Sequence, residues 1–84
     1  EVQGKSAYLF THLGRIKSVL SVTGLGLMIG LETTKNARSV AEACLQRGLI
    51  VLTAKNKIRL LPPLNINKEE MDFALKILNE VISE

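Results

Sequence analysis

Arg59 is the residue whose type and setting best suit binding chemistry in this sequence. It belongs to the segment IRLLPPL at residues 58–64, which begins as a short apolar strand and ends in two prolines and a leucine. The prolines have no N–H to donate, so the strand must end before them. Side-chain alternation places Arg59 opposite Ile58 and Leu60. A guanidinium on a rigid strand suits bidentate binding of a carboxylate. The alternative is an arginine that extends its charged head into solvent at a sheet edge.

The other residues with chemical potential are isolated. His12 is the only histidine, and with no second histidine or cysteine to share a metal we expect a surface position and no metal site. Cys44 is the only cysteine and falls in a helical apolar pattern, which predicts a buried thiol in a reducing compartment. Three glycines within residues 24–30 lack the spacing and the strand-to-helix context of a dinucleotide-binding turn.

Length and composition indicate one small globular domain. The chain has 84 residues, of which 46% are hydrophobic and 23% are charged. A net charge of +3 would allow an RNA-binding sheet, but the predicted strands contain no aromatic residue for base stacking, so we expect no nucleic-acid partner. No signal peptide and no apolar run of membrane-spanning length is visible, which favours a cytoplasmic protein with no membrane partner.

Three amphipathic helices are predicted. The first covers residues 2–18. The second begins at Asn36 as N-cap and ends at Gly48, and the third opens with a capping box between Asn67 and Glu70. The core stripe of the third helix consists of Met71, Ala74, Leu75, Leu78, Val81 and Ile82. Phe73 and Ile77 would widen this stripe, and we expect them to contact a surface outside this chain.

Three strands are predicted, at residues 19–32, 49–53 and 58–61, with a polar hairpin connection at residues 54–57. The order of elements fits a split unit in which the third strand inserts between the first two, antiparallel to both. We therefore predict an α+β fold with a three-stranded antiparallel sheet of order 1-3-2 and helices on one face. The side chains expected to face the helices are Leu25, Leu27, Ile29, Ile58 and Leu60. Those expected on the opposite face are Gly24, Gly26, Met28, Gly30 and Arg59.

Several motifs, taken in order, resemble a known family. They are GLGLMIGLE at residues 24–32, GLIVL at 48–52, IRLLPPL at 58–64 and NKEE at 67–70. Their order and spacing are similar to those of the C-terminal small domain of class III aminotransferases, which are fold-type I enzymes dependent on pyridoxal 5′-phosphate. The resemblance implies one domain over residues 1–84, with a connecting helix at 1–18 and an α+β sandwich at 19–84. Because the chain begins with Glu1 inside a predicted helix, we expect a piece of a longer protein.

The resemblance also implies roles for residues. Arg59 matches the family arginine that binds the substrate α-carboxylate, and it is the only site residue expected here. Thr23 stands where the family often has an arginine, and its role stays open. The Schiff-base lysine and the cofactor site are expected in a large domain upstream, so we expect no catalytic, cofactor-binding or metal-binding residue in this chain.

For the whole protein, the resemblance implies a cytoplasmic homodimer. It would move an amino group between N-acetylornithine, or a related ω-amine such as succinylornithine or ornithine, and 2-oxoglutarate in arginine biosynthesis. The large domain of the same chain would be a partner of this domain, and the isolated domain is expected to be inactive. The alternative is a free-standing ferredoxin-like domain for ligand binding or regulation, which the fold alone would permit.

Overall fold

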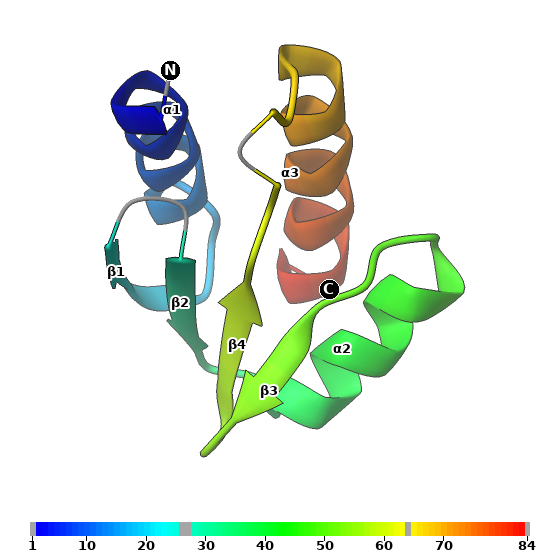
Figure 1. Cartoon of the computed structure of the whole chain (residues 1–84). Helices are drawn as coiled ribbons and strands as arrows, with labels where there is room; N and C mark the ends of the chain where they lie inside the picture. The colour runs from blue at the N-terminus through cyan, green and yellow to red at the C-terminus, as the bar shows by residue number, and fades with distance from the viewer. Residues whose placement is uncertain (1, 26–27, 64, 84) are drawn as a thin grey trace.

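One antiparallel sheet and three helices make up the computed structural model, which describes residues 2–25, 28–63 and 65–83. The four strands lie in the order β1-β2-β4-β3, and the helices lie against one face of the sheet (Figure 1). Along the chain the elements are α1 (Val2–Gly14), β1 (Val19–Leu25), β2 (Met28–Thr33), α2 (Ala37–Gln46), β3 (Leu52–Ala54), β4 (Lys57–Leu60) and α3 (Lys68–Ser83).

The main correction to the sequence prediction concerns residues 19–32, which form two strands instead of one. β1 and β2 pair as an antiparallel hairpin, so the sheet has four strands and not three. The predicted insertion of the strand at 58–61 between the other two is confirmed as β2-β4-β3, and β1 adds a fourth strand beside β2, so the order is β1-β2-β4-β3. A single strand over residues 19–32 would extend roughly 46 Å, whereas the longest dimension of the described chain is 32 Å. The α+β class and the antiparallel pairing are confirmed.

The register of the hairpin also corrects the predicted faces of the sheet. Ile29 and Ile58 are buried under the helices as predicted, and Leu60, which pairs with Ile29, is partly buried on the same side. Gly24 pairs with Ile29 and so lies on the helix-covered side, not on the opposite side. Gly26 and Leu27 and the side chain of Leu25 lie outside the described residues.

The hydrophobic core lies between the sheet and the helices. Each helix contributes fully buried side chains, which are Leu13 from α1, Val40 and Cys44 from α2, and Leu78 and Ile82 from α3. Ile77, expected to face outward, is buried with only 4% of its surface exposed, whereas Phe73 is 50% exposed. Within the described part of the chain, no helix has both the length and the apolar character that crossing a membrane requires.

Local signals set the ends of the helices largely as predicted. The Asn36 side chain accepts the Ser39 N–H at 3.1 Å, and the two members of the predicted capping box, Asn67 and Glu70, each accept the backbone N–H of the other. Gly48 adopts a positive φ of 92° just beyond α2. The largest differences in boundaries are that α1 already ends at Gly14 and that β3 begins only at Leu52, and the other end of β3 and both ends of β4 differ from the prediction by one residue.

The hairpin between β3 and β4 positions both the sheet and α2. Lys55 and Asn56 have φ values of 51° and 66°, the left-handed conformation that a tight two-residue hairpin turn needs. The Asn56 side chain accepts the backbone N–H of Ala37, the first residue of α2, at 3.0 Å. This turn therefore fixes the start of α2 against the end of the sheet that carries β4.

Candidate functional site

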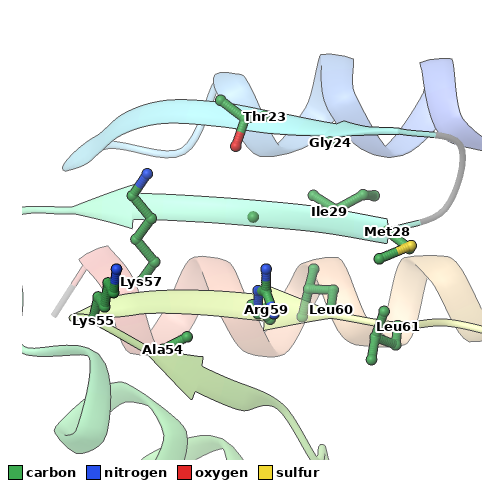
Figure 2. Close-up of a pocket in the computed structure, with 11 residues that line it drawn as sticks. Thr23, Gly24, Met28, Ile29, Ala54, Lys55, Lys57, Arg59, Leu60 and Leu61 are labelled. Atoms are coloured by element: carbon green, nitrogen blue, oxygen red, sulfur yellow. The ribbon is translucent and has the colours of Figure 1, made fainter.

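The side of the sheet turned away from the helices, here called the open face, carries the candidate site (Figure 2). The register aligns one residue from each strand in a row across it. Thr23 pairs with Gly30, Gly30 with Arg59, and Arg59 with Leu52. Residues directly paired in antiparallel strands point to the same face. The row therefore places a hydroxyl, a bare backbone, a guanidinium and an apolar side chain side by side.

A hollow of about 700 Å³ lies over the part of this row formed by Thr23, Gly30 and Arg59. We call it the open-face hollow, and its lining residues are Thr23, Gly24, Met28, Ile29, Gly30, Ala54, Lys55, Lys57, Arg59, Leu60 and Leu61. Three of them are cationic, and none of the described residues in the lining carries a carboxylate. In Figure 2 the Lys57 and Arg59 side chains both rise from β4 on the open side. Unopposed cations around a concave surface favour an anionic ligand.

Arg59 lies on an interior strand of the sheet, because β4 is flanked by β2 and β3. Its side chain is exposed, and within the described residues it makes no hydrogen bond or ion pair. The strand ends one residue later, at Leu60, just before Leu61 and the two prolines. The guanidinium thus stands on a fixed backbone position, and none of its donors is used by a described residue.

The other residues singled out in the sequence lie away from this hollow. Cys44 is buried and free in the core, and burial raises the pKa of its thiol. His12 packs its ring against Tyr8 on α1, with the ring centroids 4.4 Å apart. Among the described residues no group of histidine, cysteine or acidic side chains is arranged to hold a metal ion.

Tyr8 belongs to a polar contact between α1 and α3. Its hydroxyl donates to the Asp72 carboxylate, and Lys68 donates to the same carboxylate at 2.8 Å. The hydrogen bond from Lys68 lowers the pKa of Asp72, and the hydrogen bond to Asp72 raises the pKa of Tyr8. Asp72 on α3 therefore accepts from Tyr8 on α1 and pairs with Lys68 on its own helix, so the contact joins two helices on the side away from the open face.

Sequence reasoning placed Met28 and Gly30 on the same face as Arg59, which the structure confirms, but it did not bring Thr23, Lys55 or Lys57 to this site. Lys57 lies two residues before Arg59 on the same strand, and this spacing alone would have placed both cations on one face. Lys55 gave no such signal, and Thr23 was noted only because it stands where the family often has an arginine. Lys55 reaches the hollow through the turn between β3 and β4, and Thr23 through the hairpin between β1 and β2.

A family profile and a curated relative both match this chain over nearly its whole length. The sequence profile described as aminotransferase class-III matches residues 1–82. The acetylornithine aminotransferase of Haemophilus ducreyi is 43% identical over an alignment of 86 residues, which covers 100% of this chain and 22% of that protein. This chain therefore spans about a fifth of the length of that curated relative.

Solved structures agree with the sequence comparison. The N-acetylornithine aminotransferase of Stenotrophomonas maltophilia superposes with a TM-score of 0.89 at 31% identity, covering 98% of this chain and 25% of that one. The adenosylmethionine-8-amino-7-oxononanoate aminotransferase of Methanocaldococcus jannaschii superposes with a TM-score of 0.82 at 28% identity, covering 96% of this chain and 22% of that one. Aminotransferases that are named for different substrates therefore share this domain.

Proposed function

Because this chain belongs to the class III aminotransferase family, we propose that it is the C-terminal small domain of a full-length transaminase. The whole enzyme would move an amino group between N-acetylornithine, or a related ω-amine, and 2-oxoglutarate in arginine biosynthesis. The names of the relatives from Haemophilus ducreyi and Stenotrophomonas maltophilia support this choice of amine. Within the chain, residues 1–18 would connect to the large domain and residues 19–84 would form the small domain itself.

Arg59 is the residue that this proposal assigns to the substrate α-carboxylate. The observation that carries the assignment is an exposed guanidinium on an interior strand, bordering a hollow that is lined by three cations. A carboxylate bound there would receive two parallel charge-assisted hydrogen bonds from the planar fork. Binding of this kind orients the amino or oxo carbon of the substrate before chemistry begins. The family match over residues 1–82 disfavours the alternative of a free-standing regulatory domain.

The family implies dependence on pyridoxal 5′-phosphate, which supplies the electron sink for amino transfer. The open-face hollow does not fit this cofactor by itself. Its described lining has no carboxylate to pair with the pyridine nitrogen and no aromatic side chain to cover the ring. Lys55 and Lys57 border the hollow, but neither stands in the family's Schiff-base context. We therefore place the cofactor in the large domain and assign no chemical step to this chain.

One end of the domain offers an apolar surface for that large domain. Ile50, Leu61 and Phe73 are 78%, 55% and 50% exposed and border a groove of about 500 Å³. Exposed apolar groups gathered around a groove mark an interaction site. With this surface uncovered, the 84-residue chain is expected to self-associate in a sedimentation series. A strictly monomeric chain that binds no hydrophobic dye would contradict this part of the proposal. The homodimeric state and the cytoplasmic location of the whole enzyme are also proposals.

The test of the proposed activity compares the full-length protein with the 84-residue chain. Each is supplied with pyridoxal 5′-phosphate, N-acetylornithine and 2-oxoglutarate, and glutamate formation is measured. The full-length protein is expected to form glutamate, and the chain alone is expected to stay at the background of the free cofactor, because a covalent aldimine needs a lysine that this chain lacks in the required context. Glutamate formation by the chain alone, or none by the full-length protein with any ω-amine, would refute the proposal.

A further inference from the structure

We propose that Thr23 and Gly30 complete, together with Arg59, a seat for one carboxylate group on the open face. This inference rests on the proposed role of Arg59 and deepens it by naming two further residues that shape the same site. Thr23 would supply a second hydrogen-bond donor. Gly30 would supply the open space that lets the carboxylate lie between the two donors.

The register of the sheet brings these three residues together. Gly30 on β2 pairs with Thr23 on β1 at one side and with Arg59 on β4 at the other. Paired Cα atoms in antiparallel strands are about 4.5–5.5 Å apart, so Thr23 and Arg59 stand roughly 10 Å apart with Gly30 between them. Because Gly30 has no side chain, the surface between a hydroxyl and a guanidinium is bare backbone.

The hydroxyl of Thr23 borders that bare surface. A Cβ atom built on Gly30 would lie 3.2 Å from the Thr23 Oγ1 atom. The Thr23 hydroxyl therefore borders the space that the missing side chain of Gly30 leaves open. In Figure 2 the Thr23 oxygen extends from β1 toward β2, on the side from which Arg59 rises. A planar carboxylate placed over Gly30 can therefore accept from the guanidinium with one edge and from the hydroxyl with the other.

The donors of the seat are available to a ligand. Among the described residues, neither the Thr23 hydroxyl nor the Arg59 guanidinium makes a hydrogen bond. Thr33 on the neighbouring strand behaves differently, because its hydroxyl donates to the Lys35 carbonyl and accepts the Lys35 N–H. Thr33 therefore has a local structural role, whereas the Thr23 hydroxyl, which has no partner among the described residues, borders the cation-lined hollow.

The charge of the surroundings selects the class of ligand. The hollow is bordered by Lys55 and Lys57 in addition to Arg59. A carboxylate gains from all three charges, and a hydrogen bond from a neutral hydroxyl to a charged oxygen is stronger than one between neutral groups. The seat therefore suits the carboxylate of an amino acid or a 2-oxo acid and disfavours a neutral amide at the same place.

The experiment uses full-length holoenzyme carrying Thr23→Val, Thr23→Ser or Gly30→Ala. Valine keeps the shape of threonine without the hydroxyl, serine keeps the hydroxyl, and alanine fills the space over Gly30. Ser21→Ala is the matched control, since Ser21 lies on the same strand but its hydroxyl donates to Glu32. The readouts are KM and kcat for 2-oxoglutarate, the inhibition constant of glutarate, a dicarboxylate that cannot react, and the thermal melt.

Thr23→Val and Gly30→Ala are expected to raise KM and the glutarate inhibition constant roughly tenfold, with kcat and the melt unchanged. Thr23→Ser and Ser21→Ala are expected to stay near wild type. If both constants stay within about twofold in Thr23→Val and Gly30→Ala while Arg59→Lys raises them, the seat is wrong and the role of Arg59 stands. If Arg59→Lys also leaves them unchanged, the proposed function of Arg59 fails as well. If Thr23→Val raises KM and the inhibition constant but also lowers the melting temperature, the weaker binding reflects a damaged fold, and the proposed role of Thr23 in the seat is wrong.

Discussion

The helix-covered face and the open face of the sheet use alternate residues of the same strand. Ile58 is 1% exposed and fills the core beneath the helices, whereas Arg59, the next residue of β4, is exposed and has no partner among the described residues. The apolar face is closed by side chains from three helices, and the open face is a hollow lined by three cations. One strand therefore fixes the core with one set of side chains and presents a binding group with the other. A substitution at Ile58 should therefore change stability, and a substitution at the adjacent Arg59 should change binding.

The largest expected effect tests this separation within β4. Ile58→Ala removes a fully buried side chain, and we expect a loss of about 2–5 kcal/mol in the free energy of unfolding. Arg59→Ala on the opposite face should change it by less than about 0.5 kcal/mol, because no contact among the described residues depends on it. Urea denaturation of the two variants measures both values. Similar losses in both would contradict the division of the strand between two faces.

A second comparison sets the glycines of the two faces against each other. A Cβ on Gly24, which lies on the helix-covered side, would be 2.2 Å from the backbone carbonyl oxygen of Met28, and the paired backbone would have to move. A Cβ on Gly30 would meet the Thr23 side chain at 3.2 Å, and that side chain can rotate away. We expect Gly24→Ala to cost about 1–3 kcal/mol of stability and Gly30→Ala clearly less. Thermal melts that rank the two glycines in the opposite order would show that the β1–β2 register is different.

The smallest expected effect lies between α1 and α3, away from both the core and the hollow. The hydrogen bond from Lys68 holds the pKa of Asp72 below its ordinary value of 3.8. A carboxylate with a lowered pKa in the folded state stabilises the fold above its ordinary pKa, and this contribution is lost as the pH falls through the lowered value. Asp72→Asn should therefore melt slightly below wild type near neutral pH, and the difference should shrink as the pH falls below 3.8. A difference that grows toward acid would contradict the pairing.

Features that depend on neighbouring residues could be predicted from the sequence. The N-cap at Asn36 and the capping box of Asn67 and Glu70 join groups three residues apart, so the sequence alone contains both partners. The C-terminal end of β4 could be predicted for the same reason, because the two prolines that end the strand follow it closely in the sequence. This local context raised Arg59 as a candidate beside the alternative of a solvent-exposed arginine, and the family resemblance then assigned it to a substrate carboxylate.

Features that depend on long-range pairing could not be predicted in this way. The hairpin reversal between β1 and β2 switches the core-facing positions from Val22 and Gly24 to Ile29 and Leu31. Gly24 has no side chain to reveal the switch, so an apolar alternation appeared to continue through one strand. Because the hairpin was not predicted, Thr23 was not expected to pair with Gly30, and the row from Thr23 through Gly30 to Arg59 could not be predicted. The cap that Asn56 gives to Ala37 was missed for the same reason, because the turn and the helix are separated in sequence.

The role proposed for Arg59 is to bind a substrate carboxylate on the open face. The most direct measurement is steady-state kinetics of Arg59→Lys in the full-length enzyme, with N-acetylornithine and with 2-oxoglutarate, alongside its thermal melt. Arg15→Lys, a change of the same chemistry at an exposed residue after α1, is the control.

Replacing the planar fork by a point charge loses charge-assisted hydrogen bonding worth about 1.5–3 kcal/mol. We expect kcat/KM to fall roughly ten- to a hundredfold for both substrates in Arg59→Lys, with an unchanged melt and an unaffected Arg15→Lys control. Values of kcat/KM within about twofold of wild type for both substrates, or a melt that collapses together with the activity, would contradict the proposed role of Arg59.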